Sequence, residues 1–507
     1  MKKNVGFIFG LCVLTMILLS GCTPAATPNP PTPTLTSAPP TITPSPIPPT
    51  PTPIPPTPTL SIFSQEVERT VSEKLVAQID VSSWMGGESF KASPNGKGVA
   101  YAVQKDNKQF FIQNLEEKKH YDGIGTSSLV FSPDGNRVAY VALSGKNQQM
   151  VVLDEKEQKA YDTIGLDSIT FSPDSNRMAY AAVLDNKPIV IVDGKAEQQY
   201  DFFGYKSITF SPDSTRIVYE VGLGNKAFTV VDGKEEKHYD DIGQNSLIFS
   251  PDSKRLAYVA KIDSKWLAVV DGIEEKQYDN VYSLIFSPDS KRVAYIAEVG
   301  AELFVVVDGT EGKSNEGIGG GTLTFSPDSK QVAYVSGIGG KWFAVIDGKE
   351  SEQYEGFGEG GIVFSPDSKR FAYMVSVGNE WAVVNDGKKG KPYFGIVLGS
   401  ILFSPDSQHL AYVAGDGTSQ FAVVDGEEGN YYYFAKSLVF SPDSKHVAYF
   451  AGDGANGFIV VDAKEGEKND GVISANGNKF IFFDSPDSMH YLSLKGYDIY
   501  LIEEILK

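Results

Sequence analysis

Few side chains in this sequence have the chemistry of a catalytic or metal-binding group, and those few are regularly spaced. The last three of the five histidines are His409, His446 and His490, and each lies four residues after the proline of a Ser-Pro pair. Related stretches carry arginine at that position, as at Arg216 and Arg255. Imidazoles bind a transition metal only where several ligands converge on it. Because the three histidines belong to three separate copies of one pattern, we predict no metal site and a solvent-facing position for each.

Carboxylates recur in Asp-Gly pairs, such as Asp193-Gly194 and Asp271-Gly272, and in two Gly-Asp-Gly stretches. A calcium ion needs about six to eight converging oxygen ligands, and each Asp-Gly pair offers a single carboxylate. The pairs are therefore predicted to form hairpin turns, in which aspartate followed by glycine is favoured. Asp416 and Asp453 occupy the Gly-Asp-Gly stretches of two adjacent copies, so a turn and a binding site both remain open for them.

No arrangement in the sequence indicates a reaction. A Gly-x-Ser-x-Gly nucleophile elbow is absent, and so is a glycine-rich loop that opens a helix and could bind phosphates. The four tryptophans could stack on a sugar, but three of them begin predicted strands, where packing is the more common role. These tryptophans are Trp84, Trp266, Trp342 and Trp381. We therefore predict no catalytic residue, no cofactor and no enzymatic activity.

All of these residues are positioned by a unit that recurs at intervals of 37 to 44 residues, most often 39. The unit is marked by a Ser-Pro pair and fills the chain from about residue 90 to the C-terminus. The Ser-Pro prolines are Pro94, Pro133, Pro173, Pro212, Pro251, Pro288, Pro327, Pro366, Pro405, Pro442 and Pro486. Self-similarity at this period in strand-rich sequence is typical of propeller blades.

Each copy contains four predicted strands. The first ends in a phenylalanine two residues before the proline, which begins a turn, and the second carries Ala-Tyr, as in Ala294-Tyr295. The third runs into Asp-Gly, and a weaker fourth ends in Tyr-Asp, as in Tyr239-Asp240. We therefore predict an all-β fold, a β-propeller of about eleven four-stranded blades over residues 84–507.

Eleven copies exceed the roughly four to eight blades usual in one ring. The array could therefore form one large ring or two fused propellers. The Tyr-Asp pair is lost after the sixth copy, where Ser314-Asn315-Glu316 leads into Gly317-Ile318-Gly319-Gly320-Gly321. A division near residues 316–321 is the boundary we expect if there are two propellers.

The repeated Phe-Ser-Pro-Asp-(Gly/Ser)-x-Arg-x-Ala-Tyr pattern, as from Phe286 to Tyr295, resembles the WD-repeat-like blades of TolB-type propellers over roughly residues 90 to 490. The resemblance implies the propeller fold. In that family such blades occur in periplasmic interaction proteins, in non-catalytic propellers of peptidases and in enzymes of glycan breakdown. The resemblance therefore does not select an activity.

Residues 1–21 are predicted to be an export signal. Lys2 and Lys3 precede an apolar run from Val5 to Leu19 that is too short to span a membrane. The Leu19-Ser20-Gly21-Cys22 stretch resembles a bacterial lipobox, which implies a diacylglycerol on Cys22. The resemblance thus implies an extracytoplasmic lipoprotein anchored to the bacterial cell membrane.

Two further segments precede the repeats. Residues 22–60 hold sixteen prolines and no charged residue, a composition that cannot bury a core and favours extended polyproline II, so a disordered tether is predicted. Residues 61–83 are predicted to form a short helical lead-in on the first blade, because Val67, Val71, Leu75 and Val76 share one helical face.

The net charge of −19 excludes a nucleic-acid partner, because binding one requires a concentrated basic surface. In each blade the Ser-Pro-Asp and Asp-Gly turns fall at one end, and the connections at the other end vary from copy to copy. Binding groups tend to lie on variable loops of a rigid scaffold. The candidate binding face comprises Tyr205, Tyr282, Glu359, Asp416, Tyr432 and Asp453.

The predicted function is therefore a membrane-anchored binding or scaffold module for a protein or a cell-envelope polymer. A glycan-degrading enzyme on a propeller scaffold is an alternative, and it would need charged groups that converge at the centre of the ring. An extracytoplasmic sensor domain is a third possibility.

Overall fold

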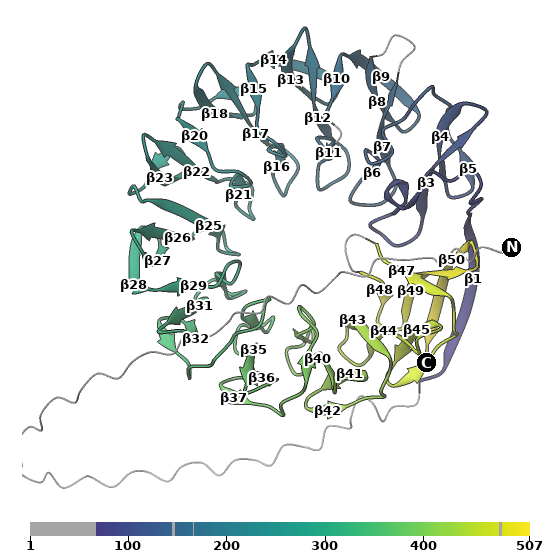
Figure 1. The fold of residues 1–507 in the computed structure, drawn as a ribbon, viewed down its shortest axis with the longest axis vertical. Coiled ribbons are helices and arrows are strands. Elements are labelled where there is room, and N and C mark those ends of the chain that lie inside the picture. The colour runs from purple at the N-terminus through teal and green to yellow at the C-terminus, as the bar shows by residue number, and fades with distance from the viewer. Residues whose placement is uncertain (1–66, 144–147, 166, 476–478) are drawn as a thin grey trace, which may run out of the picture. The chain divides into compact units, whose positions relative to one another are not determined.

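The computed structural model describes residues 67–143, 148–165, 167–475 and 479–507, and nearly every element in them is a β-strand. The single helical element in these ranges is a 3-10 turn, η2 (Gly87–Ser89). The strands form eleven antiparallel sheets of four or five strands, arranged as blades of one ring (Figure 1). The predicted all-β propeller of eleven blades is confirmed.

Each blade is built from four successive strands, numbered outward from the centre of the ring. The first strand is split in two in six blades and is a single seven-residue strand in blades 6 and 10. The first strands of blades 1 to 11 are β2 (Lys91–Ala92), β6 (Val130–Phe131), β10 and β11 (Thr163–Ile164, Thr170–Phe171), β15 and β16 (Phe202–Phe203, Thr209–Phe210), β20 and β21 (Asp241–Ile242, Ile248–Phe249), β25 (Asn280–Phe286), β29 and β30 (Gly317–Ile318, Thr324–Phe325), β34 (Val363–Phe364), β38 and β39 (Gly395–Ile396, Leu402–Phe403), β43 (Phe434–Phe440), and β47 and β48 (Gly471–Ile473, Phe482–Ser485).

The second and third strands are the longest in most blades. The second strands are β3 (Val99–Lys105), β7 (Val138–Leu143), β12 (Met178–Leu184), β17 (Ile217–Leu223), β22 (Leu256–Ile262), β26 (Val293–Val299), β31 (Val332–Ile338), β35 (Phe371–Val377), β40 (Leu410–Gly415), β44 (Val447–Gly452) and β49 (Ser488–Lys495). The third strands are β4 (Lys108–Gln113), β8 (Gln149–Leu153), β13 (Lys187–Val192), β18 (Lys226–Val231), β23 (Lys265–Val270), β27 (Glu302–Val307), β32 (Lys341–Ile346), β36 (Glu380–Asn385), β41 (Gln420–Val424), β45 (Gly457–Val461) and β50 (Asp498–Leu506).

The fourth strands form the outer edge of the ring. They are β5 (Glu116–Glu117), β9 (Lys156–Tyr161), β14 (Lys195–Gln199), β19 (Lys234–Glu235), β24 (Ile273–Glu274), β28 (Thr310–Asn315), β33 (Lys349–Glu350), β37 (Lys388–Lys389), β42 (Glu427–Glu428), β46 (Lys464–Glu465) and, in blade 11, β1 (Arg69–Gln78).

The two recurring turns set the register of each blade. In blade 4 the Ser-Pro-Asp turn pairs Phe210 of β16 with Ile217 of β17. The predicted Asp-Gly hairpin is confirmed at Asp232-Gly233, where φ is 51° and 78°. Positive φ at both central residues defines a type I′ turn, which matches the twist of paired strands and is adopted readily by aspartate followed by glycine.

The hydrophobic core lies between blades. In the described residues, one cluster of buried side chains occupies each of the eleven interfaces between neighbouring blades. The second strand is buried on both sides, so alanine and tyrosine alternate along it, as at Ala179 and Tyr180. A small residue on one face accommodates the large aromatic side chain of the adjoining blade.

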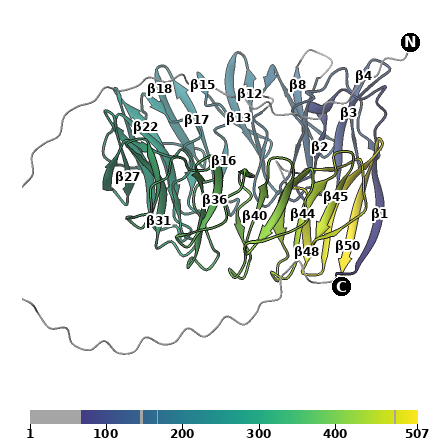
Figure 2. The ribbon, with the colours of Figure 1, turned by 60° about the horizontal axis from the view of Figure 1, so that its bottom comes forward.

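The ring is closed by the N-terminal strand. β1 pairs with β50 from Arg69, opposite Leu506, to Gln78, opposite Asp498 (Figures 1 and 2). The predicted helical lead-in is therefore wrong over the part of 61–83 that the structure describes. The last copy supplies only three strands of its own, and β1 completes its blade. Long-range pairing thus overrides the helical spacing of Val67, Val71 and Leu75.

The predicted division at residues 316–321 is also wrong. Gly317–Ile318 is β29 of blade 7, and the cluster between blades 6 and 7 joins Ile296 to Phe325 and Tyr334 as in other interfaces. The eleven blades therefore form one ring, and the alternative of two fused propellers does not apply. No helix in the described ranges is long and apolar enough to span a membrane. Residues 1–66, with the predicted signal, Cys22 and the tether, lie outside the described residues.

Candidate functional site

The ring has two faces of different character. We call a blade regular if an arginine lies four residues after its turn proline. The Ser-Pro-Asp and Asp-Gly turns of regular blades lie together at one end, where the arginine that precedes the second strand contacts the aspartate that follows the third, as Arg216 contacts Asp232. We call this end the turn face. The connections between second and third strands lie at the opposite end, which we call the variable face.

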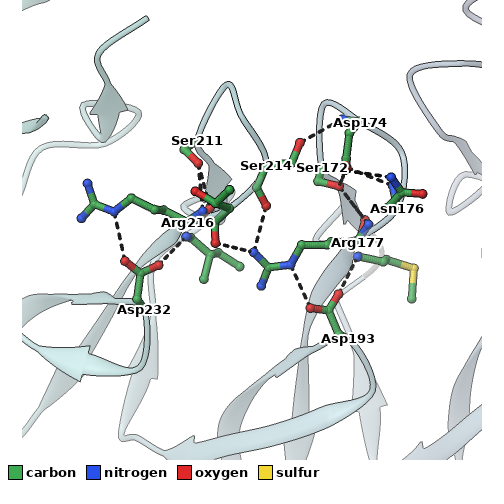
Figure 3. Close-up of polar contacts among 12 residues, drawn as sticks. Ser172, Asp174, Asn176, Arg177, Asp193, Ser211, Ser214, Arg216 and Asp232 are labelled. Atoms are coloured by element: carbon green, nitrogen blue, oxygen red, sulfur yellow. Dashed lines mark hydrogen bonds and ion pairs between the residues drawn. The ribbon is translucent and has the colours of Figure 1, made fainter. Parts of the chain in front are cut away.

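The turn face is a network of hydrogen bonds that repeats from blade to blade (Figure 3). In blade 3 the Ser172 hydroxyl donates to Asp174 Oδ1 at 2.6 Å, and the backbone N–H of Asp174 donates to Ser214 Oγ of blade 4 at 2.9 Å. Arg177 Nε donates to Asp193 Oδ2 at 2.9 Å, and its Nη1 donates to the Ser214 carbonyl at 3.0 Å. The turns therefore fasten each blade to the next.

The electrostatics of these turns agree with a structural role. The hydrogen bond from Ser211 lowers the pKa of Asp213 to about 2, and the equivalent serine bonds do the same for Asp289 and Asp328. These carboxylates stay ionised and already have protein donors. The turn face of the regular blades therefore offers few unused polar groups for a ligand.

Two of the three late histidines occupy the predicted arginine position. His409 Nδ1 lies 2.6 Å from Asp425 Oδ2, and His446 Nδ1 lies 2.5 Å from Asp462 Oδ2, a contact that raises the pKa of His446. The predicted solvent-facing environment is not found: the side chains of His409 and His446 are 16% and 15% exposed, and that of His490 is 4% exposed, between Asp484 and the Asn95 carbonyl. In the part of the chain that the structure describes, no group of three His, Cys, Asp or Glu residues could hold a metal ion.

The innermost strand carries a two-residue bulge in many blades. In blade 4 the N–H of Ser207 donates to the Gly204 carbonyl, and the Ser207 hydroxyl accepts the N–H of Glu220 on β17. The serine thus takes the place of a backbone acceptor, and Tyr205 and Lys206 are displaced from the strand. The same geometry recurs with different tip residues, at Gln244-Asn245 between Gly243 and Ser246 and at Leu398-Gly399 between Val397 and Ser400.

We call the surface formed by the innermost strands and their bulges the inner wall. Three predicted binding residues lie on it. Tyr205 is 58% exposed and donates to Asp167 of blade 3 at 3.0 Å. Tyr282 is 45% exposed and donates to Glu298 at 2.5 Å, and burial together with that carboxylate raises its pKa to about 12. Glu359 is an exposed tip residue of blade 8.

Blade 4 also carries an unusual carboxyl group. Glu220 occupies a position on the second strand where other blades have an apolar residue, such as Val259 or Val335. Its carboxyl group lies beneath Gly204, and burial, aided by the negative charge of Asp241, raises its pKa to about 7. Opposite it on β18, the Thr229 hydroxyl is buried without a hydrogen-bond partner among the described residues.

At the outer part of the variable face, ion pairs link blades 3 to 6. Lys187 of blade 3 contacts Asp201 at 3.3 Å, and Asp201 accepts the N–H of Gly224 in the second-to-third-strand turn of blade 4. Lys226 with Asp240 and Lys265 with Asp279 repeat the arrangement. In blades 3 to 6 the aspartate of the preceding Tyr-Asp pair therefore caps the turn.

Blades 9 and 10 break this pattern. Phe394 and Tyr433 replace the capping aspartate, and their turns are capped from within. Asp416 accepts the N–H groups of Thr418 and Ser419 at 2.8 and 2.7 Å, and Asp453 accepts those of Ala455 and Asn456. Asp453 also pairs with Lys468 at 2.8 Å. Of the two alternatives for Gly-Asp-Gly, the structure therefore favours the turn.

The structure separates the predicted residues into two groups. Tyr205, Tyr282 and Glu359 lie on the inner wall, and Asp416 and Asp453 lie in turns of the variable face; in the described ranges no hydrogen bond or ion pair joins any two of the five. Tyr432 is wrong as a surface residue: it is 6% exposed and packs edge-on against Tyr449.

Within the Tyr431-Tyr432-Tyr433 connection the exposed residues are the two neighbours of Tyr432, and the exposed Phe394 was not predicted. Tyr431 and Tyr433 are 52% and 71% exposed, and Phe394 is 67% exposed. Two features of the sequence indicate that these aromatic residues are exposed. Alternation along a strand turns residues 431 and 433 away from the direction of residue 432, and Tyr393-Phe394 stands where other copies have Tyr-Asp.

Two recesses lie between blades at the turn-face end. One of 460 Å³ between blades 1 and 2 is lined by Lys118, Arg137 and Tyr140, and one of 420 Å³ between blades 3 and 4 is lined by Arg216 and Tyr219. The arginines already bind the adjoining turns. These recesses are therefore gaps of the blade-to-blade network and are separate from the exposed aromatic residues.

Comparison with known proteins adds no family. No protein-family model and no curated protein sequence matches this chain. Solved structures that resemble it include a eukaryotic initiation factor, with 14% identity over 62% of this chain and 89% of that chain and a TM-score of 0.37. TolB from Acinetobacter baumannii has 17% identity over 50% of this chain and 64% of that chain, with a TM-score of 0.24.

The β-propeller domain of the Trilobed protease from Pyrococcus furiosus has 15% identity over 51% of this chain and 92% of that chain, with a TM-score of 0.25. Similarity at this level carries no functional conclusion. The propeller assignment follows from the sheet order and from the eleven interfaces between blades.

Proposed function

We propose that this chain is a membrane-anchored, extracytoplasmic binding or scaffold module that holds a protein or a cell-envelope polymer on its variable face. The observation that supports this choice is the contrast between the two faces. Polar groups of the turn face are used repeatedly in blade-to-blade hydrogen bonds, whereas the variable face and inner wall expose side chains that differ between blades. A rigid scaffold with variable exposed loops is suited to recognition.

The position of the first described residue agrees with the choice of the variable face as the binding face. The Val67 carbonyl accepts a hydrogen bond from Lys464, which follows the Asp462-Ala463 turn of blade 10 on the turn face. The described chain therefore begins at the turn face.

Chemical footprinting of the detergent-solubilised full-length chain tests the choice of face. Partners are captured from an envelope extract and from a polysaccharide panel, and the bound complex is then treated with a tyrosine-nitrating and a lysine-acetylating reagent. We expect protection of Tyr205, Tyr282, Tyr431 or Tyr433. The turn-face lysines Lys254, Lys291, Lys330 and Lys369 are about 80% exposed and serve as the matched control. Protection of those lysines instead of the tyrosines would contradict the proposal.

Replacement of the lipobox cysteine tests the anchor. We expect Cys22→Ala to move the protein from the membrane to the soluble fraction, because a single acyl-bearing residue is the proposed attachment. Cys12→Ala is the matched control and should leave the protein in the membrane fraction. Retention of the Cys22→Ala protein at the membrane would show that the anchor lies elsewhere.

A further inference from the structure

We propose that Phe394, Tyr431 and Tyr433, on the variable face of blades 9 and 10, form a stacking platform for a neutral polysaccharide. This inference rests on the proposed use of the variable face and adds both the site and the chemical class of the ligand. The three side chains are among the most exposed large aromatic groups in the described chain, at 67%, 52% and 71%.

Each of the three rings is supported on one side. Three ring atoms of Phe394 lie 3.3, 3.4 and 3.5 Å from the position that a Cβ atom on Gly417 would occupy. Such similar distances place the glycine over the face of the ring. Tyr433 lies over Gly454 in the same way, at 3.6 to 3.9 Å, and Tyr431 packs on Phe421 with ring centroids 4.3 Å apart. Because the rings remain more than half exposed, each presents its other side to solvent.

The changes around these rings are coordinated. Phe394 and Tyr433 occupy the position of the aspartate that caps a turn and pairs with lysine in blades 3 to 6. Where the aspartate is absent, the lysine is absent too, since Glu380 and Ser419 occupy its position. The turns of blades 9 and 10 are capped by Asp416 and Asp453 instead. The aromatic residues therefore take no part in capping the turns.

The chemistry of the platform favours a neutral sugar. The C–H face of a pyranose stacks on the electron-rich face of an aromatic ring. Aromatic anchors of protein interfaces fill pockets of the partner, whereas these rings are supported along the surface on neighbouring blades. The chain carries a net charge of −19, which opposes anionic polymers. The lysines beside the rings are already paired with carboxylates, Lys468 with Asp453 and Lys391 with Glu428.

Variants that restore the aspartate of other blades provide the test. Binding of the detergent-solubilised full-length chain to soluble laminarin, glucomannan and, as an anionic comparison, alginate is measured by calorimetry. We expect binding to at least one neutral polymer, and about tenfold or greater weakening in the Phe394→Asp, Tyr433→Asp double variant. Because aspartate is the residue of the regular blades, this variant should keep the fold. Phe394→Trp should retain binding, and Ile273→Ala, which removes a 71% exposed apolar group at the outer edge of blade 5, should leave it unchanged.

Two outcomes would overturn the platform: failure of the native chain to bind either neutral polymer, or full binding by the double variant. If footprinting still maps a captured partner to the tyrosines of the variable face, only the polysaccharide inference falls. If it maps the partner to the turn-face lysines, the proposed function falls as well.

Discussion

A few single residues differ from their counterparts in the other blades, and two of them introduce ionisable groups that most other blades lack at these positions. Glu220 is the clearest departure in the inter-blade core, because its carboxyl group is placed where other blades bury valine. Burial penalises the charged form and raises its pKa to about 7. His446 is a departure on the turn face, where an ionisable imidazole replaces a permanently charged guanidinium. Both residues make the stability of the ring depend on pH, Glu220 between pH 4.5 and about 7 and His446 above pH 6.5.

We predict that Glu220→Gln stabilises the protein at pH values above 7 and has little effect below pH 4.5. A carboxyl group with a raised pKa must be protonated in the fold or buried as a charge, so the native protein loses stability as pH rises from 4.5 to about 7. The expected gain is about 1–3 kcal/mol. Thermal midpoints of both proteins across this range measure it. Glu298→Gln is the control, since the pKa of Glu298 is lowered by its bond from Tyr282; it should not stabilise. A Glu220→Gln gain of equal size at all pH values would contradict the assignment.

We predict that the contribution of His446 to stability is largest below pH 6.5 and decreases as pH rises. Its pKa is raised by Asp462, so the stabilising contact is fully present below the ordinary pKa of 6.5 and is lost as pH rises through the higher value of the folded state. The difference in thermal midpoint between the native protein and His446→Gln should therefore shrink with increasing pH. An unchanging difference would indicate that Asp462 does not stabilise the imidazolium.

At the scale of elements, the Ser-Pro-Asp turn, the arginine and the Asp-Gly turn act as one device. The arginine of each regular blade bonds the aspartate of its own blade and the backbone of the next, and it lies over the next phenylalanine, as Arg216 lies 5.0 Å from the ring centroid of Phe249. Blade 7 lacks this link, because Gln331 occupies the arginine position and reaches the Ser368 carbonyl only at 3.5 Å. The chain therefore contains its own natural variant of the device.

We predict that Arg216→Gln destabilises the protein by about 1–2 kcal/mol, because one ion pair, one or two bonds to carbonyls and the contact with Phe249 are lost. The reciprocal change, Gln331→Arg, should stabilise by a smaller amount, since Asp347 and the Ser368 carbonyl are already in place. Thermal unfolding of both variants checks the pair. Destabilisation by Gln331→Arg would show that the device cannot be transferred between blades.

For the whole molecule, the decisive feature is the seam at which the ring closes. β1 crosses from the start of the described chain to pair with the last strand, and Arg69 forms a buried ion pair with Glu504 at 2.7 Å, with side chains 6% and 1% exposed. Tyr491 donates to the same carboxylate, and Arg69 also bonds the Ile459 and Lys464 carbonyls of blade 10. Blades 10 and 11 are thereby joined to the N-terminal strand.

We predict that Glu504→Gln costs about 3–5 kcal/mol, because removing one partner leaves Arg69 as a buried, uncompensated charge. The partly exposed pair of Glu73 on β1 with Lys495 on β49 is the matched control, and Glu73→Gln should cost less than about 1 kcal/mol. Hydrogen exchange should show the Glu504→Gln protein opening first along β1 and β50. Equal costs for the two variants would mean that the seam has no special part in stability.

The sequence by itself determined the blade, because the information for a blade is local. The proline of the turn, the Asp-Gly hairpin and the alternation of strands act over about 40 residues, so the fold class, the number of blades and the common end of the two turns could be predicted. The arginine register likewise placed His409 and His446 correctly without any tertiary information.

Only the tertiary structure decided how the blades close and what they leave exposed. Residues 69–78 form a strand because the last blade, more than 400 residues away, has only three strands of its own. The local spacing of apolar residues cannot show that a distant blade lacks a strand. The closed ring also buried His490 and Tyr432 while leaving Tyr431, Tyr433 and Phe394 outside. Exposure depends on the neighbouring blade, which packs on one side of each strand end, and that contact is formed only when the ring is complete.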